Sequence, residues 1–154
     1  MSQPVATLTL EQLHDKDAIR ELRYRYCRAV DTQDFKTIEA CFIASATIDF
    51  GSAGKLDSRD ALLDMMRTYA QNNSTIGLHT AHNPIIEFNS KTSASAHWVT
   101  QFTSYDPSTN TALKQSGTFV DQYIKTNEGW KITHCCYTIL FHNSHSSNIG
   151  TPII

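Results

Sequence analysis

Residues 19–50 read IRELRYRYCRAVDTQDFKTIEACFIASATIDF and combine, in order, the patterns of a helix, a break, a second helix and a strand. Apolar side chains recur every three to four residues between Ile19 and Val30, so they share one face of a helix, and Tyr26 lies on that face. Asp31 follows at the C-terminal end of this helix, where the helix dipole disfavours a carboxylate. An acidic residue at such a position suggests that it serves a function.

Capping and turn residues extend the prediction outward from this stretch. Thr9 and Gln12 form a capping-box pattern, and Asp34 and Ser58 are suitable N-caps for two further helices. Beyond residue 75 the pattern becomes that of long strands separated by short turns, which predicts antiparallel neighbours. The expected helices cover residues 9–30, 35–41 and 58–70, and the expected strands cover residues 46–50, 78–88 with a break at Pro84, 93–105, 111–126 and 130–141. The remaining residues, 142–154, receive no assignment.

The expected strand of residues 93–105 carries large side chains on both of its faces. Trp98 and Phe102 share one face, whereas Val99 and Gln101 share the other. One face of the sheet must cover the helices, and we expect the other to cover a second subunit. The sequence therefore predicts a homodimer or a higher homo-oligomer.

The composition limits the classes of partner and compartment. A chain of 154 residues can bury its own core without disulfides, so we expect a single α+β domain over residues 1–154. The net charge of −2 and the absence of a Lys/Arg run argue against nucleic acid and membrane partners and favour a small molecule. No apolar run has the length of a membrane span and the first residues lack a secretory signal pattern, so we expect a cytoplasmic protein with reduced cysteines.

The histidines do not form an evident metal site. Two pairs have a spacing found in some metal sites, namely His79 with His82 and His142 with His145. Residues three apart on a strand face opposite sides, and no cysteine or carboxylate set accompanies either pair, so we expect no metal. His97 and His134 also fall on expected strands, and each could line a pocket or a contact between subunits.

Three helices followed by a long antiparallel sheet is the element order of the cone-shaped α+β fold of nuclear transport factor 2 and its relatives. The segments Asp-Thr-Gln-Asp-Phe (31–35) and Thr-Ile-Asp-Phe (47–50) resemble the SnoaL-like branch of that superfamily, particularly scytalone dehydratase and the bile acid 7α-dehydratases. Leu-His-Thr-Ala-His-Asn-Pro (78–84) resembles the strand that presents a catalytic histidine in those dehydratases. Glu-Gly-Trp-Lys-Ile (128–132) resembles the last turn and strand of the superfamily. The resemblance covers about residues 12–141 and implies the same fold.

The resemblance also implies catalytic residues. Asp31 falls on the acid that follows the first helix, His79 on the catalytic histidine, and Tyr26 on a helix position that the bile acid enzymes use. Those enzymes use no metal or organic cofactor. Their histidine moves a proton next to a carbonyl, the carboxylate fixes its tautomer, and a phenol binds the oxygen on which charge develops. We therefore expect a cofactor-independent dehydratase or isomerase that acts on a small cyclic or polycyclic hydroxy-carbonyl compound.

Three positions depart from the resembled enzymes and make the expected pocket more apolar. Phe102 and Ile139 stand where those dehydratases carry a further His or Asp and an arginine, and Phe50 stands where scytalone dehydratase has a tyrosine. The expected substrate-binding residues are Phe50, Trp98, Phe102, Tyr137 and Ile139. Plainer roles stay open, because Tyr26 could be a core residue, Asp31 a cap and His79 an ordinary strand histidine. The alternative function is then a non-catalytic protein that binds a small hydrophobic ligand.

Overall fold

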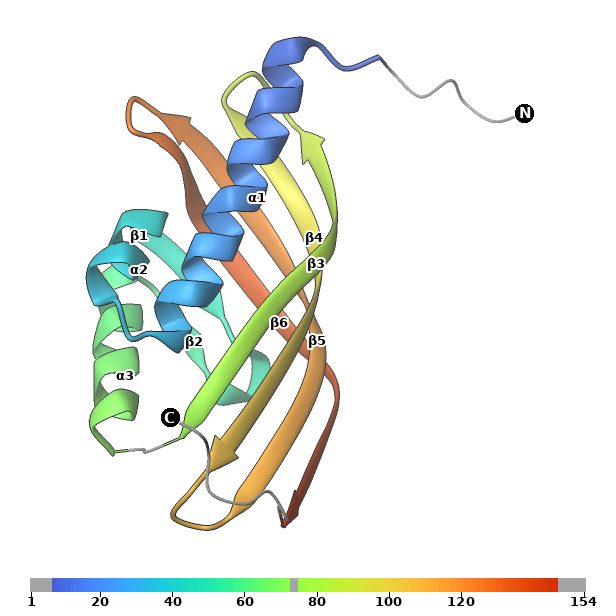
Figure 1. Ribbon diagram of the computed structural model, residues 1–154. Helices are drawn as coiled ribbons and strands as arrows, with labels where there is room; N and C mark the ends of the chain where they lie inside the picture. Colours follow the sequence, from blue (N-terminus) through green and yellow to red (C-terminus); the bar gives the residue numbers. More distant parts are fainter. Residues whose placement is uncertain (1–6, 73–74, 147–154) are drawn as a thin grey trace.

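A computed structural model describes residues 7–72 and 75–146, in which three α-helices pack on one face of a six-stranded sheet (Figure 1). The helices are α1 (Leu10–Asp31), α2 (Phe35–Cys41) and α3 (Arg59–Asn72). The strands are β1 (Phe42–Asp49), β2 (Lys55–Leu56), β3 (Ile76–Phe88), β4 (Ser93–Asp106), β5 (Thr111–Thr126) and β6 (Gly129–Ser146), with a 3₁₀ turn at Gly51–Ala53. The predicted α+β class is confirmed.

The sheet has the strand order β2-β1-β6-β5-β4-β3 and curves around α1, which crosses its concave face (Figure 1). Strands β3 to β6 form an antiparallel meander, whereas β1 pairs with β6 in parallel. The meander places residues that are far apart in sequence in rows across the concave face. One such row contains His79, Phe102 and Gln115, from β3, β4 and β5.

The helix starts lie where the capping residues predict them. The Thr9 hydroxyl accepts a hydrogen bond from the backbone of Gln12 at 3.2 Å, and the Gln12 side chain accepts one from the backbone of Thr9 at 2.9 Å. Asp34 caps α2 through the backbone N–H of Thr37, and Ser58 accepts from the N–H of Ala61 at the start of α3. These bonds satisfy N–H groups that have no partner within the helix itself.

Two strand predictions need correction. The first strand begins at Phe42 rather than at residue 46, and the loop after it contains the short strand β2, which pairs with Ile48 and Asp49. The last strand does not end at residue 141 but continues to Ser146, because residues 142–146 complete the ladder along β5. The predicted break at Pro84 is present as a register shift between β3 and β4.

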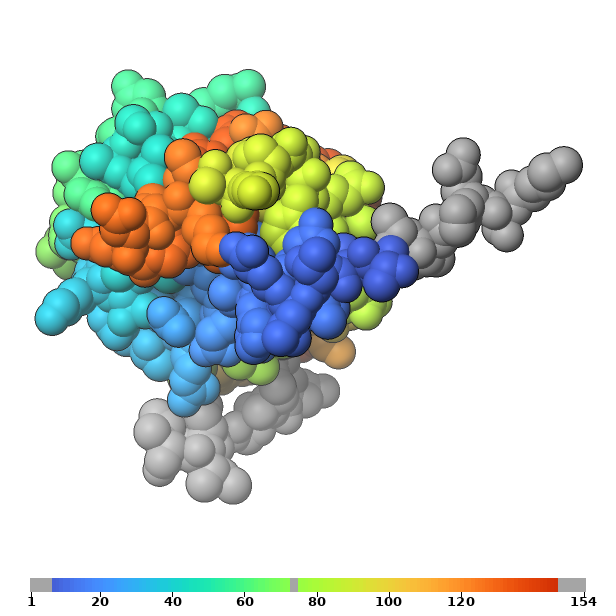
Figure 2. Space-filling view, turned by 90° about the horizontal axis from the view of Figure 1, so that it is seen from above, coloured from blue at the N-terminus to red at the C-terminus, as the bar shows by residue number. Residues whose placement is uncertain are grey.

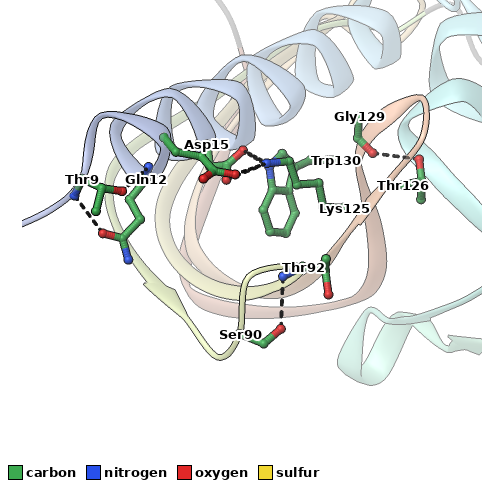
Figure 3. Close-up of polar contacts among 10 residues, drawn as sticks. Thr9, Gln12, Asp15, Ser90, Thr92, Lys125, Thr126, Gly129 and Trp130 are labelled. Carbon is green, nitrogen blue, oxygen red and sulfur yellow. Dashed lines mark hydrogen bonds and ion pairs between the residues drawn. The ribbon is translucent and has the colours of Figure 1, made fainter.

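The N-terminal half of α1 is fixed to the sheet by Asp15. Its carboxylate accepts hydrogen bonds from the Lys125 ammonium and from the Trp130 indole N–H, each at 2.9 Å (Figure 3). Burial works against the charge of Asp15, but these two donors outweigh it, so the pKa of Asp15 lies below its usual value. Figure 2 shows the start of α1 gathered with the β3–β4 and β5–β6 turns at this end of the molecule. The contact therefore ties the N-terminal half of α1 to β5 and β6.

The convex face of the sheet exposes apolar side chains. Five of them, which we call the convex patch, are Leu78, Ile85, Val99, Val120 and Ile124, with exposed fractions of 37–65%. The strand register brings Ile85 and Val120 to either side of His97. None of the described helices is long and apolar enough to cross a membrane.

Candidate active site

Asp31 and His79, which are 48 residues apart in sequence, are in direct contact. Asp31 is the last residue of α1, and its Oδ1 lies 2.6 Å from Nδ1 of His79 on β3. The backbone N–H of His79 donates to both carboxylate oxygens at 3.0 Å. An ionised carboxylate can only accept, so Nδ1 carries the proton and Nε2 is the nitrogen left free to take one. The contact therefore selects one tautomer of His79.

The Asp31 side chain does not cap the break between α1 and α2. That break is closed by backbone bonds from Gln33 to Val30 and from Asp34 to Ala29, with Gln33 in the left-handed region at φ 55°. The carboxylate instead reaches β3 and is only 13% exposed, while the His79 side chain is 36% exposed. The helix dipole disfavours a carboxylate at this position, and the hydrogen bonds from the two donors of His79 offset that unfavourable interaction.

A cavity of about 320 Å³ lies between α1 and the concave face of the sheet, and His79 borders it. Of the residues expected at the site, Tyr26, Phe50, His79, Phe102, Tyr137 and Ile139 line this cavity. Trp98 does not, because it is 1% exposed in the core, where its indole N–H donates to the Tyr123 hydroxyl at 3.0 Å. Burial raises the pKa of Tyr26, so its hydroxyl stays protonated.

His79 also borders a second cavity of about 320 Å³, which opens toward α2 and α3 and includes Asp31 in its wall. Four residues line both cavities, namely Val30, Met66, His79 and Phe102. The rings of His79 and Phe102 stack with centroids 4.3 Å apart. Phe102 therefore covers one face of the imidazole and helps to hold its orientation.

The other end of the first cavity contains polar residues that the sequence analysis did not select. Arg23 is fully buried, and its Nη1 lies 3.5 Å from Oδ2 of Asp121, which also accepts a 2.6 Å hydrogen bond from Tyr123. Burial disfavours the charged guanidinium, but the Asp121 carboxylate outweighs it, so the pKa of Arg23 lies above its usual value. Arg23 is four residues after Ile19 and three before Tyr26, and this spacing on the apolar stripe was the available signal.

Tyr137 fits into the cavity wall because residue 117 is glycine. Its ring stacks on Phe119 at 4.5 Å between centroids, and its hydroxyl accepts a 2.8 Å hydrogen bond from the Gln115 amide. A Cβ on Gly117 would lie 2.7 Å from that hydroxyl and 2.5 Å from the backbone oxygen of Thr138. Because the Tyr137 hydroxyl accepts in that bond, its O–H group is available to donate to a ligand.

The other predicted candidates lie outside the first cavity. His134 contacts the Thr47 hydroxyl at 2.7 Å, and the exposed His97 belongs to the convex side of β4. Over residues 7–72 and 75–146, no cluster of three or more His, Cys, Asp or Glu side chains is arranged to hold a metal ion.

Comparisons with known proteins give a consistent picture. The sequence model described as a SnoaL-like domain matches residues 11–135. Hexachlorocyclohexane dehydrochlorinase LinA-type3 from Novosphingobium barchaimii LL02 is 15% identical, with a TM-score of 0.83 over 93% of this chain and 98% of that one. A scytalone dehydratase-like protein from Novosphingobium aromaticivorans DSM 12444 is 18% identical, with a TM-score of 0.83 over 95% and 97% of the two chains.

A third solved structure, a nuclear transport factor 2-like superfamily protein from Salmonella enterica serovar Typhimurium, is 17% identical. Its TM-score is 0.74 over 82% of this chain and 92% of that chain. No curated protein sequence matches the chain significantly. At these identities the structural likeness establishes the fold, and the chemistry must be argued from the site itself.

Proposed function

We propose that this chain, which belongs to the SnoaL-like domain family, is a cofactor-independent lyase or isomerase with His79 as its general base. The family match over residues 11–135 confirms the resemblance drawn from the sequence motifs. The single observation that carries the proposal is the 2.6 Å contact between Asp31 and His79 at the wall of an apolar cavity. The names of the similar dehydrochlorinase and dehydratase-like structures agree with an elimination reaction.

The proposed reaction begins with proton transfer from a carbon next to a carbonyl group to Nε2 of His79. The electron pair of the broken C–H bond forms a new C=C bond, and a hydroxyl group leaves from the neighbouring carbon. His79 then returns its proton to that hydroxyl, so that water is released and the base is restored. Returning the proton to a different carbon would give isomerisation instead. General acid/base catalysis of this kind contributes about 10²- to 10⁴-fold.

Asp31 and Tyr26 would support this transfer without moving a proton themselves. The carboxylate keeps Nδ1 protonated and stabilises the imidazolium that forms when Nε2 takes the proton. Tyr26 lines the same cavity and stays protonated, so it can donate to the oxygen on which negative charge develops. Such a hydrogen bond is stronger in an apolar cavity than in water.

The proposed substrate is a small cyclic or polycyclic hydroxy-carbonyl compound. A cavity of about 320 Å³ lies at the small end of the range for ligand pockets. Its wall is mainly apolar and includes the aromatic rings of Phe50, Phe102 and Phe119. A compact ring system with few polar groups suits such a wall.

Turnover of fused-ring β-hydroxy ketones would test this proposal. The appearance of a conjugated enone is followed by ultraviolet absorbance with the wild type, His79→Gln and His97→Gln. His97 is the matched control, because it lies on the convex side of β4 and away from the cavity. We expect the His79 variant to lose turnover by at least about 10²-fold and the His97 variant to keep it. Equal turnover by all three proteins would refute the assignment of His79.

A second candidate function is binding without catalysis. Phe102 stacks on His79, and Ile139 lines the same cavity, at positions where the resembled dehydratases carry additional polar groups. The Asp31–His79 contact would then be a structural hydrogen bond. If the wild type binds a cyclic ketone tightly but does not convert it, this second function is favoured. If His79→Gln binds the compound with unchanged affinity but no longer turns it over, the enzyme is favoured.

Self-association through the convex patch is part of the same proposal. Its five apolar side chains lie on the face of the sheet opposite to the helices, and large exposed apolar patches are typical of protein contacts. We expect a second copy of the chain to cover this patch, as a homodimer or a higher homo-oligomer.

A further inference from the structure

Two buried polar side chains at the deep end of the first cavity lack hydrogen-bond partners among the described residues. They are Arg23, which is 0% exposed, and Thr100, which is 6% exposed, and both line the cavity. The Asp121 carboxylate lies at the long distance of 3.5 Å from Nη1, and the buried Cys135 thiol, a weak acceptor, also lies beside Arg23. None of the three guanidinium nitrogens makes a hydrogen bond of good geometry within the described part of the chain, so most of the five N–H donors of Arg23 are uncommitted. Buried donors without acceptors are costly, so this arrangement indicates a ligand that supplies an acceptor.

The surrounding residues hold the Arg23 guanidinium in place. Its Cζ lies 3.8 Å from the centroid of the Phe119 ring, and Asp121 is itself held by the Tyr123 hydroxyl at 2.6 Å. Thr100 pairs with Gly117 across the β4–β5 ladder, two residues from Phe119 on the same face of β5. The Thr100 hydroxyl and the guanidinium therefore belong to neighbouring rows of the same concave surface.

The distance between His79 and the deep end of the cavity allows a single ligand to contact both. Arg23 precedes Asp31 by eight residues on α1, which is about 12 Å along a helix. On β4, the other proposed donor, Thr100, lies two residues from Phe102, the partner of His79, which is about 7 Å along a strand. With a contact of about 3 Å at each end, the longer of these two spans leaves about 6 Å for the atoms of the ligand, which accommodates a skeleton of up to two rings.

The charge at the deep end favours a neutral acceptor. Asp121 already provides the counter-ion of Arg23, and the pair is fully buried. A ligand carboxylate would add a second buried negative charge beside Asp121, and desolvation of such a charge is unfavourable without a further cation. A carbonyl or hydroxyl oxygen uses the free donors and adds no net charge.

We propose that Arg23 and Thr100 form a binding site for a neutral acceptor oxygen located across the ring system from the carbon that faces His79. This inference rests on the proposed function only for the identity of the reacting end, and it adds that the substrate carries a second oxygen. Arg23 and Thr100 are then specificity residues. They determine which two-ring compounds bind, while Asp31 and His79 determine what happens to them.

Calorimetric titration with three two-ring probes tests the site. The probes are tetralin, β-tetralone and tetralin carboxylate, which share a skeleton and differ in having no oxygen, a neutral oxygen or a charged group. We expect the wild type to bind β-tetralone at least about tenfold more tightly than tetralin. Thr100→Val should weaken the binding of β-tetralone by about fivefold and leave the affinity for tetralin unchanged. Thr103→Val, on the convex side of β4, is the matched control and should change neither.

The contribution of Arg23 is measured in the double variant Arg23→Met/Asp121→Asn, which removes both charges and leaves neither buried alone. We expect its preference for β-tetralone over tetralin to fall by at least about tenfold, provided that thermal unfolding shows it to be folded. If it does not fold, Thr100→Val decides alone. Unchanged ketone preference in the variants, or failure of the wild type to bind β-tetralone, would overturn the site. Tighter binding of the carboxylate would overturn its neutral class.

The same titrations in His79→Gln separate this inference from the proposed function. Because the deep end does not use the base, we expect the ketone preference to persist in that variant. A persistent preference with no turnover by the wild type would refute the proposed enzyme and leave the oxygen site standing. If turnover depends on His79 but the ketone preference is unchanged in the Thr100 and Arg23 variants, the oxygen site is refuted and the proposed enzyme function is not.

Discussion

The Asp31→Asn substitution removes the charge of the candidate site while keeping the size of the side chain. In the wild type, the carboxylate accepts from two donors of His79, the backbone N–H at 3.0 Å and Nδ1 at 2.6 Å. An asparagine amide offers one acceptor oxygen and one NH₂ donor. In Asp31, Oδ1 accepts from both donors, whereas Oδ2 accepts from the backbone N–H alone. An NH₂ group in place of Oδ2 would oppose the backbone N–H and have no acceptor of its own. We therefore expect the NH₂ group to take the place of Oδ1 and donate to Nδ1, which loses its proton, so that the proton moves to Nε2.

The expected loss of stability follows from the same two bonds. A hydrogen bond to a charged group contributes about 1.5–3 kcal/mol and a neutral one about 0.5–1.5 kcal/mol. Two weakened bonds therefore lower the free energy of unfolding by about 2 kcal/mol, reduced somewhat because the His79 side chain is 36% exposed. Catalysis should fall by at least about 10²-fold, because Nε2 now carries a proton and cannot accept another.

Urea denaturation, turnover and ¹⁵N-histidine NMR measure the three effects in one set of proteins. Asp34→Asn is the matched control, because Asp34 caps α2 and asparagine is an equally good N-cap. We expect the control to keep its stability, turnover and His79 tautomer. The reasoning fails if Asp31→Asn also keeps the Nδ1-protonated tautomer and is as stable and active as the wild type.

Three further predictions follow from the fold. Gly117→Ala should lower the free energy of unfolding by about 1–3 kcal/mol, because the added Cβ would lie 2.5 Å from the Thr138 carbonyl oxygen. Urea denaturation measures this against the control Ser116→Ala, and equal stability of the two variants would contradict the packing described at Tyr137. Asp15→Asn should destabilise the protein by about 2 kcal/mol at neutral pH. Because the folded-state pKa of Asp15 is lowered, its contribution is present above the unfolded-state value and is lost as pH falls through the folded one, so the variant and the wild type should converge in acid; a constant difference down to pH 2 would contradict this. Ile85→Lys/Val120→Lys should reduce the mass measured by light scattering to that of a 17.3 kDa monomer, and a wild type that is already monomeric would refute self-association through the convex patch.

Local patterns account for most of the fold. The N-caps Thr9, Asp34 and Ser58 act on backbone groups only three residues away, so the helix starts could be read from short segments. Strand ends depend instead on partners distant in sequence. Residues 142–146 look polar in isolation, but they extend β6 because β5 offers an unpaired edge beside them.

The site could be predicted only in part, for a related reason. The position of Asp31 against the helix dipole marks it as a candidate from the sequence alone, but only the family resemblance relates it to His79, which is 48 residues away. Trp98 and Phe102 share one face of β4, but only Phe102 lines the cavity, because four residues along the strand carry Trp98 into the core under α1. Arg23 was missed because its fixed position depends on Asp121, a residue 98 positions later on β5.

The central claim is that His79 takes a proton from a carbon of a ligand bound in the first cavity. Its most direct test is the exchange of the acidic C–H protons of 6-hydroxy-β-tetralone, whose hydroxyl group lies across the ring system from its ketone, for deuterium in heavy water, followed by proton NMR with the wild type, His79→Gln and His97→Gln. Exchange requires only proton abstraction, so it does not depend on which group leaves. We predict that the wild type and His97→Gln accelerate exchange at least about 10²-fold more than His79→Gln. Equal exchange by the wild type and His79→Gln, with 6-hydroxy-β-tetralone bound to both, would contradict the claim.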